Sequence, residues 1–370
     1  MFGHRQRANV YFALSLVGLI TAWWLNGIAS FEGQDYLGAW FGSEVDWVLS
    51  VDLTIVAIAV AIFMITEARQ LGMKRVWLYF VLAGITALAF TFPLFMGFRE
   101  LRKEKIALAG GRIDYFEVDK HKVEVWVPEK VFPHTPVLII QDGKNIFNPK
   151  TASNGTTWEI LDALSKGRIK ADPLPIIVAV WGLSDETRLL ELAPESIVEN
   201  HPEIWDELPP EYTPPHRNSL NGEHTRFLAE ALLPTVLKRY GIEHSVNRTA
   251  ISGCSMAGLS SLYAMSKYPN SFGAALCFST HWVLGHRFMV EELVALLPQA
   301  GNHKIYTDCG TEDLDLFYPP FHEKAIRLLT ETKGYRRDRD LVAAIFPGTG
   351  HNETAWAARV HHPINWWLRG

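Results

Sequence analysis

The sequence predicts an α/β protein with a doubly wound, mostly parallel sheet, preceded by a transmembrane domain of three helices. The first observation behind this is a set of three apolar runs, at about residues 8–31, 47–66 and 76–98. Each has about the 20 residues that cross a bilayer as a helix. The second is that short apolar β-prone runs alternate with helical patterns farther along the chain, as in parallel sheets. We therefore expect a membrane domain at 1–103 and an α/β domain at 104–370.

Composition excludes some classes of function. The chain has 370 residues and a formal net charge of −5, which gives no reason to expect nucleic-acid binding. Its three cysteines, Cys254, Cys277 and Cys309, follow neither C-x-x-C nor zinc-ligand spacing. They resemble small buried hydrophobic residues, so we expect no metal site.

The membrane domain has an orientation signal in its loops. Arg5 and Arg7 precede the first run and the loop after it is acidic, so the positive-inside rule puts the N-terminus in the cytoplasm. With three spans, the second domain emerges on the periplasmic or extracellular side. The basic segment that begins at Arg99 conflicts with this, because it favours the cytoplasm. Asp52, near the start of the second run, is either an interfacial residue or a functional intramembrane carboxylate.

Residues 67–74, with the sequence Glu-Ala-Arg-Gln-Leu-Gly-Met-Lys, carry a resemblance over roughly residues 5–103. This part of the chain resembles a family of small three-helix bacterial membrane proteins. The function of that family is not established, so the resemblance implies topology alone.

The elements of the second domain follow in order. Residues 99–108 form a charged linker, and residues 113–118 and 121–127 alternate as a β-hairpin does. Further strands are predicted at 136–142, 175–181, 249–252, 273–278, 304–307 and 341–346. Helices are predicted at 156–164, 225–240, 321–330 and 353–368. The Pro-rich, acidic stretch 184–221 lacks periodicity, and loops of such length are usually functional or lids.

The strand at 249–252 leads through a tight turn into a helix, with Ser255 at its centre. In such an elbow the serine sits in a strained turn, and the residues two before and two after it must be small. Gly253 and Ala257 satisfy this. A Ser/Gly-rich turn can also simply end a strand, so a nucleophile at Ser255 requires partners.

Two later strand ends offer those partners. His351 follows a strand through a Gly-rich turn and is the best base, since it could remove the Ser255 proton. The turn after the preceding strand offers Asp313 and Asp315 as the acid. If that loop is extended, these two residues point to opposite sides and only one faces His351.

An oxyanion hole needs one N–H after the nucleophile and one from an earlier loop. Met256 supplies the first. The turn Asp142-Gly143-Lys144-Asn145 directly follows a buried strand and is placed to supply the second from Lys144. Asp-Gly alone is typical of an ordinary tight turn.

These pieces together resemble the putative-esterase family of the α/β-hydrolase superfamily, which includes enterochelin esterases, S-formylglutathione hydrolases and mycolyltransferases. The matching motifs are residues 140–147, 253–258, 278–282, 310–315 and 347–356. The resemblance implies Ser255 as nucleophile, His351 as base and the N–H groups of Met256 and Lys144 as oxyanion hole. Its Gly-Thr-x-x-Leu-Asp pattern favours Asp315 over Asp313.

The same motifs imply four candidate substrate-binding residues, which are Asp142, Gly143, His281 and Trp282. The chain departs from many relatives at Cys254 and Ala257, and neither departure removes a catalytic group. We therefore expect a membrane-anchored serine hydrolase that cleaves a carboxylic ester through an acyl-enzyme, without metal or organic cofactor. Its expected partners are the lipid bilayer and a small-molecule, lipid or sugar ester. The alternatives are an acyltransferase on the same triad and a membrane binding or sensor protein with a non-catalytic hydrolase scaffold.

Overall fold

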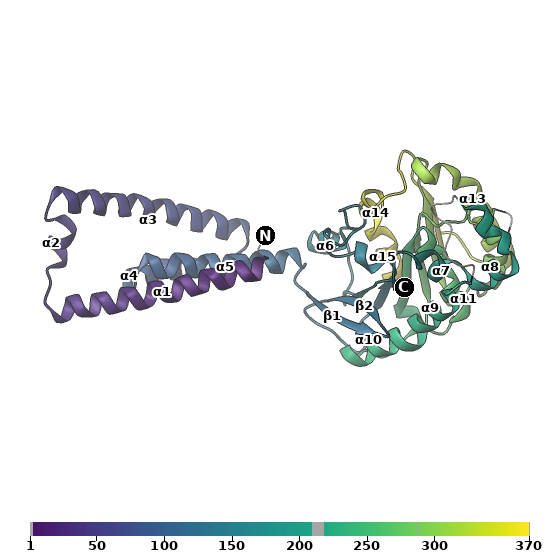
Figure 1. Ribbon diagram of the computed structural model, residues 1–370, viewed down its shortest axis with the longest axis horizontal. Helices are drawn as coiled ribbons and strands as arrows, with labels where there is room; N and C mark the ends of the chain where they lie inside the picture. Colours follow the sequence, from purple (N-terminus) through teal and green to yellow (C-terminus); the bar gives the residue numbers. More distant parts are fainter. Residues whose placement is uncertain (1–2, 209–217, 287, 370) are drawn as a thin grey trace. The chain divides into compact units, whose positions relative to one another are not determined.

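A computed structural model describes residues 3–208, 218–286 and 288–369. The chain forms two compact units, Met1–Leu108 and Ala109–Gly370 (Figure 1). The boundary expected after residue 103 lies inside helix α5 (Leu88–Ala107), because the charged segment continues that helix.

The second unit is built on an eight-stranded sheet of order β1-β2-β4-β3-β5-β6-β7-β8. Strand β2 pairs antiparallel with β1 and β4, and all later neighbours are parallel. This confirms the predicted fold class, and each predicted β run corresponds to one strand. The strands are β1 (Arg112–Val118), β2 (His121–Val127), β3 (Val137–Ile140), β4 (Ile176–Val180), β5 (Thr249–Cys254), β6 (Ala274–Phe278), β7 (Lys304–Cys309) and β8 (Leu341–Ile345).

Helices cover both faces of the sheet, because successive side chains of each buried strand point to opposite sides. Ile139 and Val178 lie in the larger core, with helices α7 (Arg188–Leu192) to α13 (Pro319–Lys333). Ile140 and Ala179 lie in the other core. The helices of that second face are α6 (Ile160–Ser165), α14 (Glu353–Arg359) and α15 (His361–Leu368).

Two predicted helices are interrupted in the structure. The pattern at 225–240 spans α9 (Asn221–Arg226), a π-helical turn and α10 (Leu233–Tyr240). Pro234 lies in the first turn of α10, and a proline cannot donate the hydrogen bond that a continuous α-helix requires there. The pattern at 353–368 divides into α14 and α15, with Pro363 in the first turn of α15.

The stretch 184–221, predicted as an aperiodic loop, contains helical structure. It holds α7, α8 (Glu195–Asn200) and a 3₁₀ segment, Pro202–Glu207. Residues 209–217 of this stretch lie outside the described residues. The remaining helices of the second unit are α11 (Met256–Lys267) and α12 (Met289–Leu296).

The first unit is helical, and two of its helices are long and apolar enough to cross a membrane. These are α1 (His4–Phe31) and α3 (Glu44–Gln70), joined by the short helix α2 (Tyr36–Phe41). The run at 76–98, expected as a third span, is not one helix. It is divided between α4 (Trp77–Ile85) and α5, with a break at Thr86 and Ala87.

Helices α4 and α5 form a hairpin that returns toward the end at which α1 begins. Helix α5 runs antiparallel to α1 and packs closely along it (Figure 1). The Ser15 hydroxyl donates to the Phe90 carbonyl at 2.9 Å. At the other end of α5, Glu100 accepts from Arg7 of the first turns of α1 at 2.8 Å. The end of α5 therefore lies beside the start of α1.

Helix α3 ends at the same level. Arg99 of α5 donates to Glu67 at 2.5 Å, and the guanidinium of Arg102 donates to the Leu71 carbonyl at 2.8 Å. The start of α1, the end of α3 and the charged part of α5 thus form one charged end of the unit.

Candidate active site

Ser255 occupies a sharp turn between β5 and α11. Its backbone angles, φ 56° and ψ −124°, are strained for a residue with a side chain. A Cβ added to Gly253 would lie 2.5 Å from the Ala257 Cβ, so both flanking positions must be small. The predicted strand–elbow–helix geometry is present, and Ser255 lies at the carboxyl edge of the sheet.

Two backbone N–H groups face this edge without a partner. Met256 begins α11, where helix N–H groups have no acceptor within the helix. Lys144 lies in a 3₁₀ turn, Gly143–Asn145, directly after β3. Among the described residues neither N–H has a hydrogen-bond acceptor, which fits the predicted oxyanion hole.

Asp142 does not offer a free carboxylate to a substrate, in contrast to its expected role. Arg188 of α7 grips it with two bonds, Nε to Oδ1 at 2.8 Å and Nη2 to Oδ2 at 2.5 Å. Asp142 has φ 56°, so the ion pair holds the strained start of the turn that carries Lys144. No motif marks Arg188, which lies 46 residues from Asp142 in the sequence.

Asp315 and His351 are joined directly. The His351 Nδ1 lies 2.6 Å from the Asp315 Oδ1, and Asp315 is fully buried. The other carboxylate oxygen accepts from the Gly310 N–H and the Ser279 hydroxyl, both at 2.6 Å. Burial raises the pKa of Asp315, but the bonds from His351, Ser279 and Gly310 outweigh it and hold the pKa below its usual value.

Asp313 is exposed and makes no hydrogen bond with His351 among the described residues, although its carboxylate lies beside Gly350. The expected extended loop is a 3₁₀ turn, Asp313–Phe317, and Asp313 has φ 52° at its start. The two aspartates still diverge, because the turn directs Asp315 inward.

Ser255 and His351 share no hydrogen bond in the described structure. Such bonds are often long in free enzymes and shorten when a substrate is bound. Instead the buried Tyr318 hydroxyl hydrogen-bonds to His281 Nδ1, and the Tyr318 ring meets that of His351 edge-on at 5.6 Å. Burial raises the pKa of Tyr318, and a hydrogen bond with Ser255 opposes this rise. Tyr318 belongs to no sequence motif and was not predicted as a site residue.

The two candidates after β6 have different environments. His281 lies beside the nucleophile, and its backbone N–H donates to the backbone carbonyl of Ser255 at 3.3 Å. Burial, followed by the nearby His351, lowers the pKa of His281 to about 3, so its ring is neutral near pH 7. Trp282 is fully buried and its indole N–H donates to Thr307 at 3.4 Å, so it belongs to the core rather than to a substrate surface.

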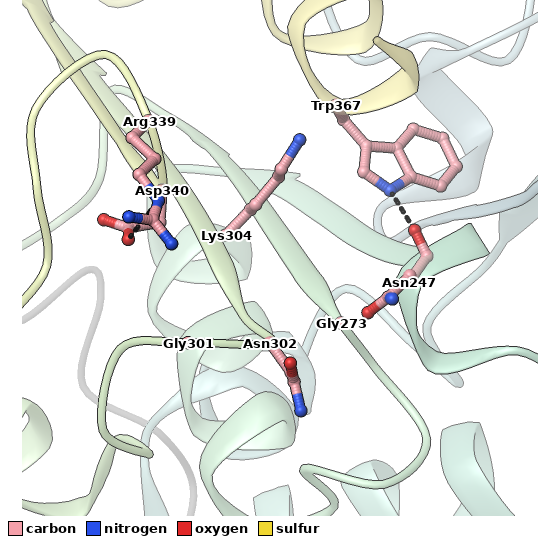
Figure 2. Close-up of a pocket in the computed structure, with 8 residues that line it drawn as sticks. All are labelled: Asn247, Gly273, Gly301, Asn302, Lys304, Arg339, Asp340 and Trp367. Atoms are coloured by element: carbon pink, nitrogen blue, oxygen red, sulfur yellow. Dashed lines mark hydrogen bonds and ion pairs between the residues drawn. The ribbon is translucent and has the colours of Figure 1, made fainter. Parts of the chain in front are cut away.

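A separate cavity of about 270 Å³ lies at the opposite edge of the sheet, where β7 begins. In Figure 2 the side chains of Arg339 and Asp340 lie together, as an ion pair at 3.9 Å. The ammonium group of Lys304 lies 5.3 Å from the centre of the Trp366 ring. These charges do not converge on one point. No group of three or more His, Cys, Asp or Glu side chains in the described parts of the chain could hold a metal ion.

Comparison with known families identifies the second unit. Residues 119–361 match the family described as "Putative esterase", which is more than half of the chain. The chain belongs to this esterase family. Membership confirms the predicted resemblance and, at the level of the family, the expectation of a carboxylic ester hydrolase. Residues 10–101 match "Protein of unknown function DUF2834".

The solved structures that resemble the chain include three esterases. The enterobactin esterase from Shigella flexneri, solved with enterobactin, has 15% identity and a TM-score of 0.49, over 70% of this chain and 58% of that one. The enterobactin hydrolase IroE has 17% identity and a TM-score of 0.49, over 70% and 95%. A ferulic acid esterase has 16% and 0.46, over 70% and 98%. The chain thus matches little more than half the length of the Shigella enzyme, and no curated protein matches its sequence.

Proposed function

We propose that this protein is a membrane-anchored serine esterase with Ser255 as nucleophile, His351 as base and Asp315 as acid. The observation that carries the proposal is the 2.6 Å contact between His351 Nδ1 and Asp315 Oδ1. It lies at the same edge of the sheet as the strained elbow of Ser255. A carboxylate on Nδ1 keeps the proton there and leaves Nε2 free to act as a base.

The reaction then follows from these groups. The Ser255 oxygen attacks the ester carbonyl carbon while its proton passes to Nε2 of His351. The N–H groups of Met256 and Lys144 stabilise the negative charge on the carbonyl oxygen. The alcohol leaves with the proton from His351, and an acyl-enzyme remains. Water repeats the sequence, so that ester and water give acid and alcohol.

Helices α1 and α3 are the proposed membrane anchor, and the hairpin of α4 and α5 suggests two crossings rather than three. The end of α5 pairs with the start of α1 through Glu100 and Arg7, and with the end of α3 through Arg99 and Glu67. Helix ends that share one charged cluster belong on one side of a bilayer, since buried charges are costly there.

This arrangement revises the expected localisation. The positive-inside rule keeps the N-terminus in the cytoplasm. With two crossings, the chain re-enters the cytoplasm before the esterase unit. The basic segment after Phe98, which conflicted with three spans, then lies on the side that it favours. We therefore propose a cytoplasmic esterase unit.

Labelling with a fluorophosphonate probe tests the nucleophile. The wild-type protein should be labelled and should hydrolyse p-nitrophenyl esters, whereas Ser255→Ala should do neither. His351→Ala should lower kcat by roughly 10⁴ or more. Ser252→Ala and His362→Ala are matched controls, because they lie outside the site. Wild-type turnover in Ser255→Ala would refute the proposal.

A further inference from the structure

Ser279, directly after β6, lies at the centre of a buried polar network behind the proposed triad. It is fully buried and has φ 39°, an unfavourable conformation for serine. Its N–H donates to Asp308 Oδ1 at 2.8 Å, which helps to hold this conformation. In this backbone conformation the Ser279 hydroxyl points toward Asp315.

The contacts of the Ser279 hydroxyl fix the direction of its proton. The oxygen accepts from the Trp356 indole N–H at 2.9 Å and from Arg359 Nη2 at 3.2 Å. Indole and guanidinium groups can only donate, and a hydroxyl has two lone pairs and one proton. Both lone pairs are therefore used. The proton has one direction left, toward Asp315 Oδ2 at 2.6 Å.

This direction determines the state of the next two groups. Asp315 Oδ2 receives two donors, Ser279 and the Gly310 N–H, so it holds no proton of its own. The pKa of the Asp315 carboxyl lies below its usual value, so the group is ionised near neutral pH. Its Oδ1, which lies 2.6 Å from His351 Nδ1, therefore accepts a hydrogen bond from that nitrogen. His351 then carries its proton on Nδ1, and Nε2 is the basic nitrogen.

A buried ion pair anchors the network from behind. Arg359 donates to Asp308 through Nε at 2.9 Å and Nη2 at 3.0 Å. Asp308 also accepts from the Tyr306 hydroxyl at 2.6 Å. Asp308 and Arg359 are both buried, and the paired guanidinium cannot rotate away from Ser279 without leaving Asp308 unpaired.

We propose that Ser279, oriented by Trp356 and the Arg359–Asp308 pair, is a positioning residue that holds Asp315 ionised and His351 in its reactive tautomer. The inference rests on the proposed function of the triad. The other titratable groups whose charges couple to Asp315 or His351 are His281, Cys309, Tyr318 and His322. The charged pair of Arg359 and Asp308 contacts Ser279 itself.

Ser279→Ala tests the proposal, since it removes the hydroxyl and keeps the Cβ at the same φ. Losing a hydrogen bond to a charged group should lower kcat/KM about tenfold to a hundredfold, mainly through kcat. With one donor fewer, the Asp315 carboxylate stabilises the protonated imidazolium of His351 more strongly. The acidic limb of the kcat/KM profile should therefore move to higher pH, by up to about one unit.

Trp356→Phe provides a second variant that keeps an aromatic ring beside His351. Without the indole N–H, the Ser279 hydroxyl is a weaker donor, so the acidic limb should move in the same direction by a smaller amount. Ser252→Ala is the matched control: Ser252 is equally buried, but its hydroxyl donates to the Leu276 carbonyl at 2.7 Å. It should leave the pH profile unchanged.

The measurements use the full-length protein in detergent, with active sites titrated by a fluorophosphonate. An unchanged acidic limb in Ser279→Ala, with activity lost only in proportion to unfolded protein, would overturn the proposal. The NMR chemical shift of the His351 Nδ1 proton, which should be strongly deshielded, would provide a readout that does not depend on turnover. If the wild type hydrolyses no ester, the proposed function fails, whereas a shift of this proton in Ser279→Ala still supports the positioning role.

Discussion

Asp313 and Asp315 stand two residues apart in one turn and have opposite environments. Asp315 is fully buried, with its two oxygens bonded to three donors, and the pKa of its carboxyl lies below its usual value. Asp313 is exposed. A group held by hydrogen bonds in a water-poor site can fix an imidazole, while an exposed one is screened by solvent.

Asp315→Asn should therefore reduce kcat by about 10⁴, because an amide favours the wrong tautomer of His351. The same substitution of the triad aspartate in a serine protease has an effect of about this size. Asp313→Asn should retain nearly full activity and serves as the matched control. Steady-state hydrolysis of a p-nitrophenyl ester measures both. The reverse result would assign the acid to Asp313.

At the scale of elements, the turn after β3 depends on one glycine. A Cβ on Gly143 would lie 2.6 Å from the carbonyl carbon of Ala179 and 2.7 Å from the N of Val180, both in the backbone of β4. Backbone cannot rotate away as a side chain does. The turn that offers the Lys144 N–H therefore packs against β4 only because residue 143 has no side chain.

Gly143→Ala should displace this turn and lower kcat about tenfold to a thousandfold, since losing one oxyanion donor has roughly such an effect. Gly258→Ala is the control: its Cβ would lie 3.4 Å or more from its neighbours, and alanine favours a helix. Kinetics with a p-nitrophenyl ester compare the two. Equal activity in both variants would exclude the turn from the oxyanion hole.

The elements that the sequence predicts well are those with a local cause. Buried parallel strands such as β3 and β4 are continuous apolar runs, and Ser255 and His351 follow strand ends. The interruptions in two helices have a local cause in Pro234 and Pro363, but the helical pattern on both sides of each proline predicts one continuous helix. Arg188, Ser279 and Tyr318 were also missed as site residues. Their partners are distant in sequence, and buried long-range hydrogen bonds leave no periodic pattern.

At the scale of the whole molecule, three histidines are buried in the esterase unit with lowered pKa values. Burial lowers the pKa of His224 and His281 to about 3 and of His322 to about 4, from 6.5. In the unfolded chain the three histidines become protonated below pH 6.5, whereas in the folded chain they stay neutral until the pH approaches their lowered pKa values. Stability is therefore present above pH 6.5 and is lost as the pH falls toward 4.

The free energy of unfolding should fall by about 1.4 kcal/mol per pH unit for each histidine that stays neutral in the folded state. Thermal unfolding of the esterase unit, followed from pH 7 to pH 4.5, measures it. His322→Gln should make the dependence on pH shallower. Constant stability between pH 6.5 and 5 would contradict the assignment.

The two-crossing arrangement predicts the location of reporters. A reporter fused after Gly370 should be cytoplasmic, because α5 ends beside the start of α1. A reporter inserted after Gly33, between α1 and α2, should be on the opposite side. Enzymatic reporters active on one side of the membrane alone measure both positions. A non-cytoplasmic signal after Gly370 would mean that residues 76–98 cross the bilayer.

The three cysteines should react slowly with thiol reagents while the protein is folded. Cys254, Cys277 and Cys309 are free and buried, and burial raises the pKa of each thiol. Only a thiolate attacks alkylating reagents. A maleimide should therefore not label the folded wild-type protein. Lys150→Cys would place a reactive cysteine at an exposed position. Membrane-impermeant and permeant maleimides applied to intact cells would then report where that residue lies without any fused domain.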